Sequence, residues 1–241
     1  MPKYFYFLTV FVFTGFITMA QPPKQAVVLY KKAGAFKEKG MFNEAITTYT
    51  NAIAIDKKYD SAYLQLAQLY TSISQADNAV RVLKEGISQI PDFTSANITL
   101  GNLYRDNLKN YAEAINSYLA ALKTDSTNKA TYYALAWCSN AKEYYRDAIK
   151  YAIKALDIDN NYIPAYNELG HAYRQLKAYD ECIVQLKKNL AISVNQVPLL
   201  YTGFCYTELK QKDEALKVYE TLNKLNPKMA EALKKMIDKM Q

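Results

Sequence analysis

Few side chains in this sequence are suited to catalytic chemistry. His171 is the single histidine, so a metal site with two histidine ligands cannot form. His171 has no nucleophile and no carboxylate at a metal-ligand spacing near it in the sequence. No glycine-rich phosphate loop is present. Acidic pairs such as Asp213-Glu214 lie just before the small core residue of a repeat. Their negative charges there interact favourably with the positive N-terminal end of the second helix. The sequence therefore predicts a protein that is not an enzyme and needs no cofactor.

A small residue followed by an aliphatic one recurs six times along the chain. Successive intervals are 34, 35, 34, 34 and 33 residues, and so steady a period indicates one supersecondary unit copied along the chain. The six pairs are Ala45-Ile46, Ala79-Val80, Ala114-Ile115, Ala148-Ile149, Cys182-Ile183 and Ala215-Leu216.

Apolar residues within each unit lie three and four apart, as in Ala114, Ile115 and Tyr118. This spacing predicts amphipathic helices, two of which fill one period. The small residue lets the paired backbones approach closely, and stacking of units supplies stability that one hairpin lacks. We expect the one-residue excess of the long interval in the turn at residues 106–110.

Unit 5 carries the best-formed motif, Tyr166-x-x-Leu169-Gly170-x-x-Tyr173. It resembles the tetratricopeptide pattern W-x2-L-G-x2-Y with Tyr in place of Trp. The other units are weaker copies, and the closing proline appears only as Pro91 and Pro227. The resemblance covers residues 26–228. It implies an all-α, right-handed α-solenoid of about six helix-turn-helix repeats, with a capping helix over residues 229–241, that works as a protein-interaction scaffold.

The first twenty residues belong to another class of segment. Lys3 gives a positive start, an apolar run follows to Ile17, and small residues precede Gln21. This order predicts a signal peptide over residues 1–20, a short linker over 21–25, and export to a bacterial periplasm or cell envelope. An uncleaved anchor stays open as the alternative, because residues 4–20 reach the short limit of a bilayer span. The mature chain itself is not expected to insert into a membrane.

The three cysteines fall at repeat positions. Cys182 takes the small core position, and Cys138 and Cys205 share a second position, so we predict buried thiols that pack as small apolar residues. An odd number of cysteines at equivalent positions is not typical of a disulfide framework. A bridge between Cys138 and Cys182, in adjacent units, stays open as an alternative.

The charge balance is mildly basic, with 30 basic and 23 acidic residues and a net charge of +7. Only four of the basic residues are arginine, and lysines are spread over every unit. Nucleic-acid binding is therefore not predicted.

The resemblance also implies which side chains face the concave groove, because the first helix of each repeat lines it. Asparagines there can pair with a peptide backbone, arginines can grip a carboxylate, and Trp137 with Tyr133 can anchor an apolar side chain. The family's carboxylate clamp is not predicted, since Tyr30 and Gly34 replace its first lysines. The candidate groove residues are Asn102, Arg105, Tyr133, Trp137, Asn140, Asn167, His171 and Arg174.

We therefore predict a scaffold that holds a peptide or protein segment along units 3 to 5. A merely solvated groove is the plainer alternative. A second function class is a structural assembly subunit of an envelope complex, which self-associates or binds through its convex surface or its ends. The identity of the partner is not readable from the sequence.

Overall fold

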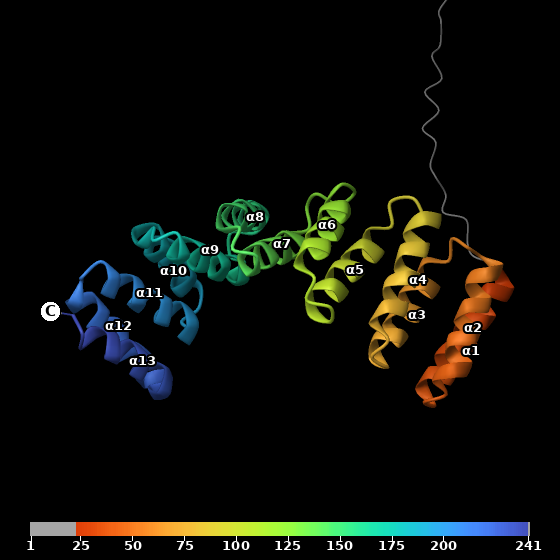
Figure 1. The fold of residues 1–241 in the computed structure, drawn as a ribbon, viewed down its shortest axis with the longest axis horizontal. Helices are drawn as coiled ribbons and strands as arrows, with labels where there is room; N and C mark the ends of the chain where they lie inside the picture. Colours follow the sequence, from red (N-terminus) through yellow and green to blue (C-terminus); the bar gives the residue numbers. More distant parts are fainter. Residues whose placement is uncertain (1–22, 241) are drawn as a thin grey trace, which may run out of the picture.

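The computed structural model describes residues 23–240, and that part of the chain forms thirteen α-helices and no strand (Figure 1). The predicted signal peptide, residues 1–20, lies outside the described residues. The helices are α1 (Lys24–Glu38), α2 (Phe42–Ile55), α3 (Asp60–Ser72), α4 (Ala76–Gln89), α5 (Thr94–Asp106), α6 (Tyr111–Leu122), α7 (Lys129–Ala141), α8 (Tyr145–Ile158), α9 (Ile163–Gln175), α10 (Tyr179–Ile192), α11 (Gln196–Glu208), α12 (Lys212–Leu225) and α13 (Pro227–Ile237).

Helices α1 to α12 pair into six hairpins that stack in chain order from α1 towards α13 (Figure 1). The predicted all-α solenoid of six helical pairs with a further C-terminal helix is confirmed. Helix α1 begins at Lys24, inside the segment predicted as a linker. Pro23 is its N-cap residue and accepts the first helical hydrogen bond from Val27 N, so the proline starts the helix and does not extend the loop.

The small residue of each unit is the contact between the two helices of a hairpin. All six of these residues have no exposed surface, which lets the backbones lie close together. Gly170 on α9 makes a similar close contact with α10, because the buried side chain of Leu186 occupies the space that a side chain at Gly170 would need. The close approach predicted from the repeat is therefore present in the structure.

The turns inside the hairpins share one backbone feature. Each contains a residue in the left-handed region: Gly40 in the first hairpin, with φ of 73°, and non-glycine residues such as Lys177, with φ of 59°, in the others. The turn at residues 107–110 is one residue longer than its equivalents. This confirms the predicted place of the extra residue in the long interval.

The last helix, α13, covers the open end of the stack. It begins at Pro227, two residues before the predicted Met229, because proline suits the first helical position and the Asn226 side chain caps the helix by accepting from Met229 N. It buries Leu233 and Ile237 against α11 and α12. The predicted capping helix is confirmed, with an earlier start.

Alternate helices build the inner layer of the solenoid. In the described part of the chain, the substantial contacts between next-but-one helices join α3 to α5, α7 to α9, α9 to α11, and α11 to α13. Elements on the inside of a curved stack lie closer together than those outside, so the first helices of the units line the inner face. No helix of residues 23–240 is both long and apolar enough to cross a bilayer.

Substitution of Gly170 tests the helix contact. An alanine Cβ at Gly170 would overlap Leu186 Cδ2 and lie 2.8 Å from its Cγ. We expect Gly170→Ala to lower the free energy of unfolding by about 1–3 kcal/mol, because Leu186 is fully buried and cannot move aside. In a Leu186→Ala background the same substitution should cost much less. Urea unfolding of the four proteins of this cycle measures the difference, and equal costs in both backgrounds would contradict the assigned contact.

Gly40 tests the left-handed backbone of the first turn, and Gly34 inside α1 provides the control. Gly40→Ala should lower the free energy of unfolding by about 1 kcal/mol, because its positive φ disfavours a side chain although no atom lies within 4 Å of the new Cβ. Gly34→Ala is the matched control. It lies inside α1, its Cβ would make an ordinary contact of 3.7 Å with Tyr49 Oη, and it should raise the free energy of unfolding by roughly 0.5–1 kcal/mol. Thermal melts that move in the same direction would contradict this difference between turn and helix.

Candidate ligand-binding groove

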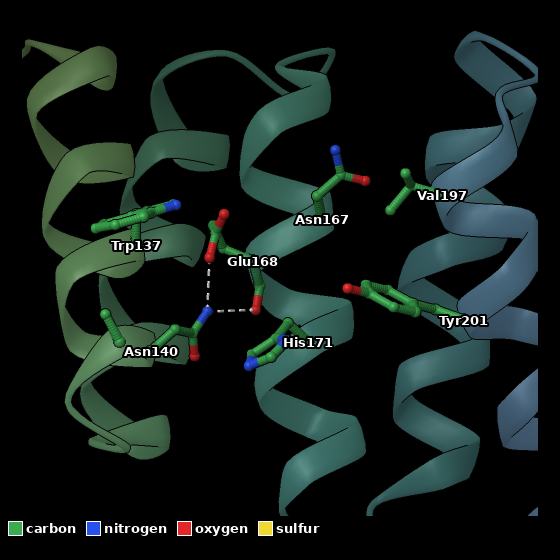
Figure 2. Close-up of a pocket in the computed structure, with 8 residues that line it drawn as sticks. Trp137, Asn140, Asn167, Glu168, His171, Val197 and Tyr201 are labelled. Carbon is green, nitrogen blue, oxygen red and sulfur yellow. Dashed lines mark hydrogen bonds between the residues drawn. The ribbon is translucent and has the colours of Figure 1, made fainter. Parts of the chain in front are cut away.

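A hollow of about 400 Å³ opens on the inner layer between α7, α9 and α11 (Figure 2). Four of the eight predicted groove residues line it, and they come from units 4 and 5. The lining residues are Trp137, Asn140, Ala141, Asn167, Glu168, His171, Val197 and Tyr201. Its volume is within the range of sites that hold one ligand side chain or a small ligand.

A polar bridge between α7 and α9 forms the floor of the hollow. Asn140 Nδ2 donates to Glu168 Oε2 at 2.7 Å and to the Glu168 carbonyl oxygen at 3.1 Å (Figure 2). Both acceptors are oxygens, so the amide orientation of Asn140 is fixed. Its Oδ1 is buried and has no hydrogen-bond partner in the described structure. A buried acceptor that nothing in the described chain satisfies thus lies on a residue that lines the hollow.

Burial perturbs the two titratable groups of the hollow. Desolvation raises the pKa of the Glu168 carboxyl, against the opposing effect of the Asn140 hydrogen bond. Desolvation also lowers the pKa of His171, and the positive charge of Arg174 adds to this. His171 is therefore neutral near pH 7. The Glu168 carboxyl has no Lys or Arg partner among the described residues.

Aromatic rings form the walls of the hollow. Trp137 packs edge-to-face on Tyr111, with ring centroids 5.5 Å apart. His171 lies between Tyr145 and Tyr201, at centroid distances of 6.3 and 6.4 Å. Figure 2 shows Trp137 and Tyr201 on opposite sides of α9, with the Tyr201 hydroxyl directed towards the hollow. An apolar or aromatic group of a ligand can therefore pack between two units.

The two predicted arginines lie beside the hollow and do not line it. Arg105 forms a two-point ion pair with Asp106, at 2.7 and 2.8 Å, which raises its own pKa and lowers that of Asp106. Its Cζ lies 5.9 Å from the Trp137 ring centroid. Arg174 lies over Tyr201, with Cζ 5.2 Å from the ring centroid, and its buried Nε has no partner in the described structure. The Arg105 guanidinium is therefore already paired with a carboxylate, whereas the Arg174 guanidinium has no carboxylate partner in the described structure.

The remaining predicted residues have partners within the solenoid. The hydroxyl of Tyr118 donates to Asn102 Oδ1 at 2.7 Å, and this leaves Asn102 outside the hollow. Asn189 Nδ2 donates to Asn167 Oδ1 at 2.9 Å. Tyr133 packs on Tyr162 at 6.0 Å between centroids and lies outside the hollow. Asparagine contact with a ligand backbone is thus open at Asn167 Nδ2, while Asn102 supports its own hairpin.

Sequence reasoning missed Glu168 and Tyr201. They occupy equivalent places in repeats 5 and 6, and Glu168 directly follows the predicted groove residue Asn167. Repeat 4 has Ala134 at the equivalent place. A carboxylate and a phenol where a neighbouring repeat has alanine are the sequence signal that could have identified these two residues as part of the site. Among residues 23–240 no three His, Cys, Asp or Glu side chains come together in a way that would hold a metal ion.

Comparison with known proteins identifies the repeat. Patterns described as "TPR repeat" and "Tetratricopeptide repeat" match residues 33–73, 60–93, 94–128, 163–193 and 199–228. The chain belongs to the tetratricopeptide repeat family. Its hairpins are tetratricopeptide repeats, and the hollow is built by the first helices of repeats 4, 5 and 6.

Solved tetratricopeptide structures share this fold. YrrB, described as a TPR protein with an unusual peptide-binding site, matches at 20% identity over 78% of this chain and 97% of its own, with a TM-score of 0.68. PilW, described as a widely conserved type IV pilus biogenesis factor, matches at 18% identity over 88% and 99%, with a TM-score of 0.66. MamA from Desulfovibrio magneticus RS-1 matches at 17% identity over 71% and 97%, with a TM-score of 0.61. At these identities the likeness is one of fold.

Burial of the Glu168 carboxyl should make the free energy of unfolding depend on pH. Its pKa is raised in the folded protein above the ordinary 4.5, so on raising the pH the unfolded chain loses this proton first. Folding is then progressively disfavoured between the unfolded and the folded pKa. We expect Glu168→Gln to gain free energy of unfolding relative to the wild type as the pH rises from about 4.5, until the pH passes the raised pKa of the folded protein. Denaturant titrations across this range measure the difference, and a difference that is constant with pH would contradict the raised pKa.

Proposed function

We propose that this protein is an exported, non-catalytic scaffold that binds an extended peptide or protein segment along its inner face, anchored in the hollow between α7, α9 and α11. The observation that carries the proposal is the hollow itself. It joins three tetratricopeptide repeats and holds aromatic walls, a carboxylate and an unsatisfied acceptor in one concave place. Sites of this composition are typical of side-chain recognition.

The floor of the hollow favours a hydrogen-bond donor from the ligand. Glu168 has no cationic partner among the described residues, and Asn140 Oδ1 lacks a donor. A lysine or arginine side chain of the partner would pair with the Glu168 carboxyl. Neutral His171 would not repel that charge. The anchoring side chain of the ligand is therefore basic, and an apolar neighbour packs against Trp137 or Tyr201.

Arg174 extends the proposed site towards α11. Its guanidinium has no carboxylate partner in the described part of the chain, so it stays available to an acidic group of the same ligand. Arg105 takes a lesser part, because a ligand carboxylate would first displace Asp106. The ligand that fits best carries a basic side chain for the hollow and an acidic group beside it.

Two similarities support this role and place. YrrB is a tetratricopeptide protein described by its peptide-binding site, and PilW is described as a pilus biogenesis factor. The charged start, apolar run and small residues of the first twenty positions support export. A function at a bacterial cell envelope is consistent with the predicted export signal and with the description of PilW.

A peptide library displayed on phage tests the site without a known partner. Peptides selected on the protein should share a basic residue next to an apolar one. Trp137 is the only tryptophan, so its fluorescence should change when a selected peptide binds. Trp137→Ala should weaken binding by about 2 kcal/mol, roughly 30-fold in Kd, because buried aromatic anchors dominate such interfaces.

Charge is tested by a matched pair of variants. Glu168→Gln should weaken binding of a selected peptide and flatten its salt dependence, because the ion pair to the basic side chain is lost. Glu181→Gln, an exposed carboxylate on α10 outside the hollow, should leave binding unchanged. Helical circular dichroism checks that each variant is folded. Selected peptides that bind equally well to the Trp137 and Glu168 variants would place the site elsewhere.

Assembly with copies of itself is the second candidate function. Ile158, Ile192 and Leu225 are the last residues of α8, α10 and α12, and all three are exposed at 39% or more. This row of apolar side chains at one position in three successive repeats favours a contact outside the groove. Sedimentation distinguishes the two functions, since a concentration-dependent oligomer that Ile192→Ser disrupts supports assembly, whereas a monomer supports the groove.

A further inference from the structure

Two cysteines meet at the contact between repeats 5 and 6. Cys182 on α10 and Cys205 on α11 have no exposed surface, and their Sγ atoms are 2.7 Å apart. Sulfur atoms that are not bonded do not normally approach so closely. A disulfide bond of about 2.05 Å would need them to move together by only ~0.6 Å.

The pair differs from the bridge that the sequence left open. Cys138 packs in the core cluster of the N-terminal repeats, while Cys182 and Cys205 pack together in the C-terminal cluster. A bond between Cys138 and Cys182 is therefore not formed by this fold. The close pair joins the small core position of repeat 5 to a first-helix position of repeat 6.

We propose that Cys182 and Cys205 form an intrachain disulfide bond that fastens repeat 5 to repeat 6. The oxidant is a disulfide, either a small molecule such as oxidised glutathione or a thiol-disulfide oxidase. One cysteine thiolate attacks the oxidant to give a mixed disulfide and one thiol. The second cysteine thiolate then displaces the remaining half. The two protein thiols lose two protons and two electrons, and the oxidant leaves as two thiols.

Oxidation takes place when α10 and α11 are apart. In the closed protein the hydrogen bond to Cys182, together with burial, raises the pKa of the Cys205 thiol, and no oxidant reaches either sulfur. Folding, or local opening at the end of a solenoid, exposes both thiols before the repeats pack. Packing then holds the sulfurs in contact, which favours the bond once formed.

The bond would act directly behind the hollow. The Cys182 thiol also donates to the Gly170 carbonyl oxygen on α9 at 3.3 Å, one residue before His171. Oxidation removes the proton of this hydrogen bond, but α10 stays packed against α9. The disulfide therefore fastens α11 to the α9–α10 hairpin, and α9 and α11 both line the hollow. Oxidation fixes the spacing between them.

Thiol counting tests the proposal without any knowledge of a ligand. The full chain is refolded in a glutathione redox buffer and in dithiothreitol, then denatured in N-ethylmaleimide, and the adducts are counted by mass spectrometry. We expect one adduct after the glutathione buffer, on Cys138, and three after dithiothreitol. The oxidised protein should melt about 5–10 °C higher, because the cross-link restricts the unfolded chain.

Alanine variants provide the controls. Cys182→Ala matches the residue at the same position in the other five repeats, so it should fold. It should show two adducts in both buffers and no oxidative rise in melting temperature. Cys138→Ala should keep that rise. As a measurement that needs no refolding, protein purified from the host's envelope and alkylated directly should carry one adduct. Three adducts after the glutathione buffer, or a bond that includes Cys138, would overturn the proposal.

Discussion

Each hairpin of this solenoid depends on one close approach between its two helices, at a residue no larger than cysteine. The residue is fully buried in all six repeats, and only a small side chain there lets a large one from the partner helix fill the remaining space. A second contact of the same kind lies on the facing helix of repeat 5, where Leu186 fills the space beside Gly170. The rest of the fold follows, because hairpins of equal thickness stack at a constant interval and direct their first helices inwards.

The hollow is a consequence of that stacking. Repeats 4, 5 and 6 each contribute one first helix to the inner layer, and the side chains between those helices differ from repeat to repeat although the backbone does not. Asn140 and Glu168 connect α7 to α9, while Val197 and Tyr201 leave the space between α9 and α11 open. The scaffold therefore supplies the concave shape, and a few positions that vary between repeats supply its chemistry.

The sequence was sufficient for the fold because burial at one small position recurs with the repeat. It was less informative about the site. Four predicted residues share the hollow, but Glu168 was missed, since its partner Asn140 lies 28 residues away and their contact depends on how two repeats dock. Arg105 was expected to be free, although Asp106 follows it directly. Sequence alone does not decide whether neighbouring charges on a helix pair with each other or with a ligand. The contact between Cys182 and Cys205 also depends on how two repeats dock, so the sequence did not predict it.

The division of the core has a mechanical consequence. The buried residues fall into three clusters that follow one another along the chain, and α7 is shared between two of them, with Cys138 in the first and Ala136 in another. A solenoid built in this way is an elastic rod, in which each joint bends independently of distant ones. Because α7 is also one wall of the hollow, bending at this joint changes the width of the groove. Tension on the ends of the rod would thus be converted into a change in the shape of the hollow.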